Sequence, residues 1–166
     1  MADILPDVLQ PGLRLVICGS AAGSVSAREH AYYGHRQNRF WPTLAATGLT
    51  PRQFAPAEYP DLPEFGIGLT DITKTEFGAD AVLTSHDAGR LRAALQQYRP
   101  TILAFNGKRA ASLGLGRPSG SLAYGRLAET FCETAVFILP STSPPAVRWW
   151  DIAPWHELAA AVREAG

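Results

Sequence analysis

Four short, nearly continuous apolar runs, separated by polar stretches, dominate the pattern of this 166-residue chain. They cover residues 13–19, 67–72, 101–105 and 135–139, and three of them are closely followed by glycine or proline. Runs of this length and composition are typical of strands that are buried on both faces of a sheet. Residues 1–12 hold two prolines and a glycine, and we expect them to form an N-terminal arm.

Apolar residues recur at helical spacing between these runs. The spacing predicts helices over 38–47, around 91–98, over 108–113 and over 155–164, whereas residues 19–35 show no helical period and residues 49–65, with four prolines, predict a loop or short turns. Strands that alternate with helices indicate an α/β fold, a three-layer α/β/α sandwich around a central, mainly parallel sheet. We expect one domain over residues 1–166.

Composition and charge narrow the class of protein. The chain is 46% hydrophobic and 18% charged, which is typical of a globular domain. Its 15 basic and 15 acidic side chains balance, which excludes binding of nucleic acid by bulk positive charge but allows a local basic patch. No apolar run reaches about 18 residues, and no secretory signal is evident, so we expect a cytoplasmic protein without membrane contact. Cys18 and Cys132 make no metal motif, and we expect neither a metal nor a cofactor.

Candidate chemistry follows the predicted strands, because ligands of parallel sheets bind beyond the carboxyl ends of the strands. The small-residue turn at 19–26 lets backbone approach a ligand, but it lacks the glycine spacing of a dinucleotide site and the lysine of a triphosphate loop. Asp71 follows the second run and could orient a water or stabilise positive charge. Residues 31–41 combine aromatic rings, cations and an amide, a mixture that suits base stacking and phosphate contact.

Together these segments resemble the uracil-DNA glycosylase superfamily, in particular its mismatch-specific uracil/thymine-DNA glycosylase and hypoxanthine-DNA glycosylase branches. The resemblance runs from about residue 12 to residue 148, and the motifs stand in the family's order as Gly19-Ser20-Ala21-Ala22-Gly23, Tyr33-Gly34-His35, Asn38-Arg39-Phe40-Trp41, Gly68-Leu69-Thr70-Asp71, Phe105-Asn106-Gly107-Lys108 and Pro140-Ser141-Thr142-Ser143. One departure matters. The family's first-motif Asn, which positions the attacking water, is replaced by Ala21, so this role does not carry over to that position.

The resemblance implies a monomeric repair enzyme that flips a deaminated base, with uracil expected first, out of DNA and hydrolyses its N-glycosidic bond. An abasic site would remain, and the protein would associate with the nucleoid when acting. We expect no lyase activity, because neither Lys74 nor Lys108 shows a reason to be desolvated.

The implied roles are distributed over the motifs. Asp71 is the first choice, and Asn38 the second, for holding the water. Tyr33 would stack on the base. Backbone N–H groups of Ser20, Ala21 and Ala22 would contact the base oxygens. His35 and Ser141 would contact the leaving group or phosphate. The loop that faces DNA would carry Ser143, Pro145, Val147 and Arg148, with Pro145 or Val147 as a wedge, Arg148 on phosphate and Lys108 on a further phosphate.

Three alternatives stay open. The small residues Ala21 and Ala22 would give a deeper pocket that suits a hypoxanthine or xanthine glycosylase. Loss of the first-motif Asn is compatible with a catalytically weak homologue that binds damaged DNA. A flavodoxin-like protein could instead hold the phosphate of a small molecule at the turn formed by residues 19–26.

Overall fold

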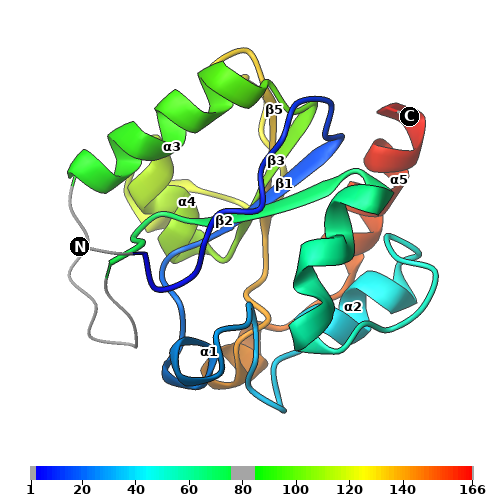
Figure 1. Ribbon diagram of the computed structural model, residues 1–166. Helices are drawn as coiled ribbons and strands as arrows, with labels where there is room; N and C mark the ends of the chain where they lie inside the picture. Colours follow the sequence, from blue (N-terminus) through cyan, green and yellow to red (C-terminus); the bar gives the residue numbers. More distant parts are fainter. Residues whose placement is uncertain (1–2, 76–84, 166) are drawn as a thin grey trace.

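The computed structural model describes residues 3–75 and 85–165, and it contains a five-stranded sheet of order β2-β1-β3-β5-β4 (Figure 1). Four strands run parallel, and β4 pairs with β5 in the antiparallel sense. The strands are β1 (Leu15–Gly19), β2 (Ile67–Asp71), β3 (Ile102–Asn106), β4 (Gly125–Arg126) and β5 (Ala135–Leu139). All four predicted strands are therefore confirmed, each within two residues of its expected ends.

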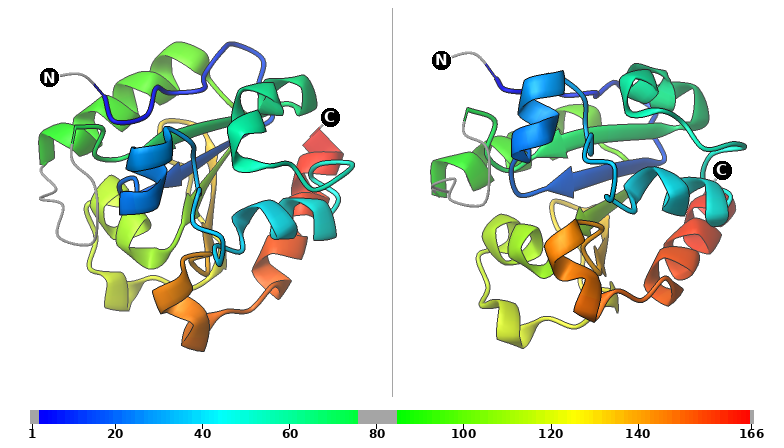
Figure 2. Two further views of the ribbon diagram at one scale, coloured as in Figure 1. Left: turned by 60° about the horizontal axis from the view of Figure 1, so that its bottom comes forward. Right: turned by 90° about the horizontal axis from the view of Figure 1, so that it is seen from below.

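Helices cover both faces of the sheet, as Figure 2 shows, and the predicted three-layer arrangement is confirmed. One face carries α2 (Phe40–Ala46), α5 (Ala153–Ala165) and the 3-10 helix η1 (Pro56–Phe65), and the other carries α3 (Ser85–Tyr98) and α4 (Lys108–Leu115). Successive residues of β1 serve opposite layers: Ile17 packs in the cluster with Trp155, whereas Val16 packs in the cluster with Leu91. This alternation explains why each parallel strand is apolar throughout.

Short helical segments are the main departure from the predicted elements. Residues 19–35 show no helical period, yet α1 (Ser24–Glu29) forms there. A helix of six residues that buries only Ser26 leaves no apolar period to detect. Two further 3-10 segments are η2 (Ser119–Ser121), which lies between α4 and β4, and η3 (Pro144–Trp149), which follows β5.

The N-terminal arm packs against the free edge of β2. Val8 forms an antiparallel bridge with Leu69, and the Ile4 amide donates to the Lys74 carbonyl at 2.6 Å. Leu5 is buried in the core that contains β1 and α2. The arm is thus an integral part of the fold, and it brings residues 3–8 to the end of β2.

The described ranges contain neither a membrane-spanning helix nor a cluster of metal-binding side chains. None of their helices has both the length and the apolar character needed to cross a membrane. Nor do residues 3–75 and 85–165 bring three metal-binding side chains of the His, Cys, Asp or Glu type together.

Candidate active site

The carboxyl ends of β1 and β2 place Gly19 and Asp71 side by side. The two residues are partners in the parallel register. Beyond the strands, the Ile72 amide donates to the Gly19 carbonyl at 2.8 Å and the Thr73 amide donates to the Ser20 carbonyl at 2.9 Å. The backbone therefore fixes Asp71 against the small-residue turn that follows β1.

Gly19 leaves space for two oxygen atoms that come from distant segments. A Cβ at this position would lie 2.7 Å from Oδ1 of Asp71 and 3.2 Å from the hydroxyl oxygen of Tyr33. A carbon at 2.7 Å from a carboxylate oxygen is closer than van der Waals contact allows. Absence of a side chain at Gly19 thus lets the Asp71 carboxylate and the Tyr33 hydroxyl converge on one point.

The Asp71 carboxylate is buried among charged groups. The residue is 6% exposed, and Lys74, Asp7 and Arg90 are the charges that act on it. Burial is the largest influence on the pKa of the Asp71 carboxyl, Lys74 and Arg90 lower the pKa, Asp7 raises it, and the net result is a pKa raised to about 6. Such a group titrates near neutral pH and is a physical candidate for general-base work.

Tyr33 reaches the same point in a strained backbone conformation. Its φ of +53° lies in the left-handed region that bulky residues rarely adopt. The ring stacks on Phe40 with centroids 3.9 Å apart, and the hydroxyl is buried with no hydrogen-bond partner in the described structure. Burial and then the Asp71 charge raise the pKa of the Tyr33 hydroxyl well above its ordinary value, while the Asn106 side chain, which faces the hydroxyl outside hydrogen-bond geometry, lowers it. The hydroxyl therefore keeps its proton.

The next two strands end in a polar pair that is fully satisfied. Nδ2 of Asn106 donates to Oγ1 of Thr142 at 3.0 Å, and the Thr142 amide donates back to Oδ1 of Asn106 at 3.1 Å. The Thr142 carbonyl accepts from the Arg39 amide at 3.0 Å. These bonds tie the end of β3, the loop after β5 and the start of α2 together.

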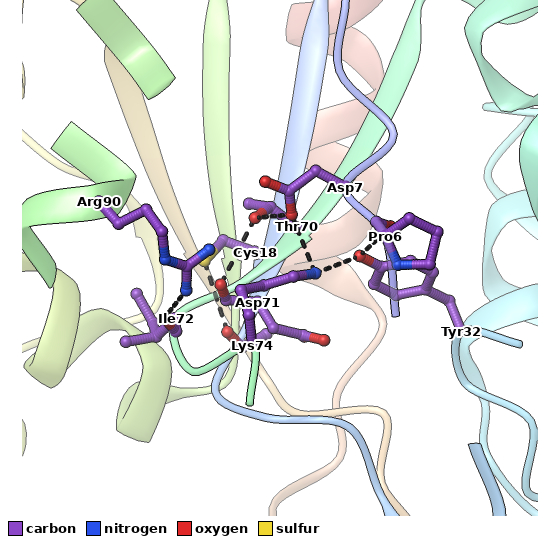
Figure 3. Close-up of polar contacts among 10 residues, drawn as sticks. Pro6, Asp7, Cys18, Tyr32, Thr70, Asp71, Ile72, Lys74 and Arg90 are labelled. Carbon is purple, nitrogen blue, oxygen red and sulfur yellow. Dashed lines mark hydrogen bonds and ion pairs between the residues drawn. The ribbon is translucent and has the colours of Figure 1, made fainter. Parts of the chain in front are cut away.

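An ion pair between a buried lysine and an exposed aspartate connects the arm to the end of β2, as Figure 3 shows. Nζ of Lys74 lies 2.9 Å from Oδ1 of Asp7 and donates to the Tyr32 hydroxyl at 2.9 Å. Oγ1 of Thr70 donates to the same Asp7 oxygen at 2.7 Å. The side chain of Lys74 is only 1% exposed, so the expectation that no lysine is desolvated is wrong. The arm, which supplies Asp7, is what encloses it.

Several predicted residues lie near the site but make local contacts. Oδ1 of Asn38 accepts from the Phe40 amide at 2.9 Å, which supports the first turn of α2. His35 is exposed, and its Nδ1 accepts from the Gln37 amide at 3.0 Å, so the structure leaves it on the surface. The three turn residues stand next to Gly19, with Ser20 and Ala21 half-buried and Ala22 buried.

The loop after β5 carries the residues predicted to face DNA. Oγ of Ser141 interacts with Ser143, 3.0 Å from its hydroxyl oxygen and 3.2 Å from its amide nitrogen. Figure 1 places η3 and α1 at the same end of the molecule, where the parallel strands finish. Within η3, the exposed residues are Pro145, Val147, Arg148 and Trp149.

Lys108 lies apart from the Asp71 and Tyr33 oxygens. Its ammonium lies 4.5 Å from the centroid of the Tyr124 ring. It also lines an open hollow of about 480 Å³ with Arg109, Ser112, Leu113 and Ser119. Neither Asp71, Tyr33 nor Ser141 lines this hollow, so it is separate from the candidate active site.

Comparison with known proteins agrees with this arrangement. The family model described as the uracil DNA glycosylase superfamily matches residues 6–162. The chain belongs to the uracil DNA glycosylase superfamily. The superfamily match includes every strand, all five α-helices at least in part, and the end of the arm.

A solved structure is similar over almost the whole length of this superfamily member. It is the solution NMR structure of a protein from Methanosarcina acetivorans that is provisionally assigned as a uracil DNA glycosylase. The TM-score is 0.59 at 22% sequence identity, and the match covers 97% of this chain and 96% of the other. At that identity the likeness supports the shared fold.

Sequence reasoning missed three features of the site. Trp149, 60% exposed, was not selected, although two adjacent tryptophans after a proline-rich loop were a visible signal. The pairing of Asn106 with Thr142 was also missed, because the sequence shows only an amide side chain directly after a buried apolar run. The contact between Asp7 and Lys74 joins residues far apart in the chain and left no local signal.

Proposed function

We propose that this protein is a monofunctional DNA glycosylase that hydrolyses the N-glycosidic bond of a deaminated base, with uracil as the principal substrate. The observation that carries the proposal is the buried carboxylate of Asp71, with its raised pKa, at the strand ends of a superfamily fold. A carboxylate held in this way costs folding free energy, and such costs concentrate at functional sites.

The reaction begins with eversion of the base, because the bond to be broken is inaccessible inside a duplex. Unpairing and unstacking cost a few kcal/mol, and least at a mismatch or in a single strand. The everted base would stack on the ring of Tyr33, which Phe40 supports from behind at 3.9 Å. Backbone N–H groups of Ser20 to Ala22 would contact the base oxygens.

Bond cleavage then develops positive charge on the sugar and negative charge on the base. The bond between C1′ and the base nitrogen breaks, and its electron pair leaves with the base. Asp71 stabilises the cationic sugar and accepts a proton from the water whose oxygen bonds to C1′. Asn38 is the second choice for this role, although its Oδ1 is engaged with the Phe40 amide. Ser141 would assist at the departing base or at a phosphate, and His35 is restricted to phosphate by its surface position.

The DNA surface is proposed to lie over η3. Val147 is 53% exposed, and the Arg148 guanidinium lies 5.3 Å from the centroid of the Trp149 ring. Val147 or Pro145 would fill the gap left by the everted base, and Arg148 would contact phosphate, as would Lys108 farther along the edge. Ser143 begins this segment and stiffens it through its bonds to Ser141.

A lyase step is not part of the proposal. Schiff-base chemistry needs a neutral amine that can reach C1′. Lys74 is buried, and its nitrogen is already engaged by Asp7 and by the Tyr32 hydroxyl, so it is not free to attack C1′. The product is therefore an intact abasic site, which alkali would cleave. We propose that the protein acts as a monomer and needs no cofactor.

Hypoxanthine is the second candidate base. The turn beside Gly19 carries only methyl side chains at Ala21 and Ala22, and this leaves more room above the base than larger residues would. A purine in this space would use the same carboxylate and the same bond cleavage.

A strand-cleavage assay tests the proposal. Oligonucleotides that each carry one uracil, hypoxanthine, xanthine or thymine mismatch are incubated with the protein and then treated with alkali. Cleavage of the uracil strand after alkali, and none before it, is the expected result, with Asp71→Asn as the inactive control. Cleavage of hypoxanthine alone would assign the second candidate, and tight binding to abasic DNA with no cleavage of any strand would indicate a non-catalytic homologue.

A further inference from the structure

We propose that the Tyr33 hydroxyl and the Asp71 carboxylate together hold the attacking water, on the side of Gly19 where their two oxygens converge. The inference rests on the proposed function and deepens it, because it gives Tyr33 a catalytic role besides that of a stacking ring. It also says which groups replace the missing first-motif Asn.

Convergence of the two oxygens is the first support. Oδ1 of Asp71 and the hydroxyl oxygen of Tyr33 approach the same point from different elements, 2.7 Å and 3.2 Å from the position of a Gly19 Cβ. Asp71 is fixed by the β1–β2 register, and Tyr33 is fixed by its stack on Phe40. Both groups are held by rigid elements, as the positioning of a reactive water requires.

Absence of a partner for the Tyr33 hydroxyl is the second support. In the described part of the chain, the Tyr33 hydroxyl is a buried polar atom with no hydrogen bond, and it lies beside the buried Asp71 carboxylate. Buried polar groups are almost always hydrogen-bonded, and an exception calls for an explanation such as an ordered water or a ligand. One water can donate to the carboxylate and bond to the hydroxyl, which satisfies both oxygens at once.

The third support is that the packing of the Tyr33 ring does not require its hydroxyl. The ring of Tyr33 is already stacked on Phe40 and tilted against Tyr32, so the contacts of the ring do not need the hydroxyl. A φ of +53° adds backbone strain, and such strain persists where the surrounding structure fixes a residue for function. The strained backbone of Tyr33 thus places its hydroxyl beside the Asp71 carboxylate.

The proton balance follows from the two groups. Asp71 takes one proton from the water as the water oxygen bonds to C1′, while the Tyr33 hydroxyl keeps its own proton and only orients the lone pairs of the water. Ala21 offers no side-chain donor or acceptor, so the positioning comes from β2 and from the loop before α2 instead of the first-motif turn.

Tyr33→Phe is the decisive variant, because it removes one oxygen atom and keeps the ring. We expect its single-turnover excision rate on uracil DNA to fall by at least tenfold, with unchanged affinity for DNA that carries an uncleavable uracil analogue. Tyr59→Phe removes a hydroxyl from a neighbouring ring outside the site and is the matched control. Equal rates for wild type and Tyr33→Phe would overturn the inference.

One further measurement separates a water site from a packing effect. A high-resolution crystal structure should show an ordered water between the Tyr33 and Asp71 oxygens in the wild type and none in Tyr33→Phe. Finding no water in an active wild type would refute the inference, while a wild type that cleaves no lesion would refute the proposed function instead.

Discussion

Two polar pairs at the same edge of the sheet use their hydrogen-bonding groups in opposite ways. At the end of β3 and in the loop after β5, Asn106 and Thr142 are joined by two hydrogen bonds of 3.0 and 3.1 Å. At the ends of β2 and β1, Asp71 and Tyr33 converge on Gly19, and the Tyr33 hydroxyl has no hydrogen-bond partner among the described residues. The first pair stabilises the fold, whereas the second buries a carboxylate and an unbonded hydroxyl at a cost in stability.

Proton linkage makes this cost visible. The pKa of Asp71 is raised by burial from its ordinary 3.8 to about 6, so the folded protein holds a proton more tightly than the unfolded chain does. Stability is therefore greatest below the ordinary pKa and falls as pH rises toward 6, above which the buried charge remains. Near neutral pH the fold carries an unfavourable carboxylate, which is the form that accepts a proton from water.

The largest expected effect is that of Asp71→Asn. Excision should fall by roughly a hundredfold or more, the usual effect of losing a general base, while the free energy of unfolding at pH 8 should rise by about 2 to 3 kcal/mol. Single-turnover kinetics and urea denaturation measure the two changes. A near-normal rate would move the role to Asn38, and a loss of stability would show that the carboxylate is structural.

Asn106→Ala should give the opposite result. It removes both bonds to Thr142 and leaves a buried amide unpaired, which costs about 2 to 3 kcal/mol of stability. Urea denaturation at pH 7 measures the change. A stability equal to that of the wild type would end the contrast between the two pairs.

The rate of excision should depend on pH through Asp71. Since the carboxylate acts in its ionised form and its pKa is about 6, activity should fall by about tenfold from pH 7 to pH 5. The pH profile should be flat between pH 7 and 8. The fall in activity below pH 7, the acid limb of the profile, should be absent from the residual activity of Asp71→Asn. An acid limb that persists in this variant would assign the titration to another group.

Two tryptophans repeat the contrast at a smaller scale. Trp155 is fully buried, and its Nε1 donates to the Pro140 carbonyl at 3.1 Å, whereas Trp149 is 60% exposed. Trp149→Ala should leave stability unchanged and weaken DNA binding by about 1 kcal/mol, the lower end for one base–aromatic stack. Fluorescence anisotropy on single-stranded and duplex DNA measures the effect, and unchanged affinity on both would exclude contact with a base.

The smallest expected effect is a shift of the acid limb in Asp7→Asn. Asp7 raises the pKa of Asp71, and Lys74 and Arg90 lower it, with Cys18 and Tyr33 also facing the carboxylate. Removal of the Asp7 charge should therefore lower the pKa of Asp71 and move the limb to more acidic pH. A profile that moves to higher pH would show that the arm acts by placing Lys74 and not by its own charge.

Sequence patterns predicted the layers and the edge at which the site lies, because buried parallel strands are visible as apolar runs. They also selected Asp71 and Tyr33. They could not show that the two side chains meet at Gly19, since this depends on the β1–β2 register and on a positive φ at Tyr33. The burial of Lys74 depends on an arm residue more than sixty positions away in the chain, and no local pattern records such a contact.

The bridge between Val8 and Leu69 has a consequence for solubility. β2 is the outer strand of the sheet, and an unpaired outer strand invites pairing with other molecules. The arm occupies part of that edge. The segment that carries Asp7, one of the charges around Asp71, therefore also protects β2 from pairing with another molecule. Changes that loosen the first ten residues would then cause precipitation and altered chemistry together.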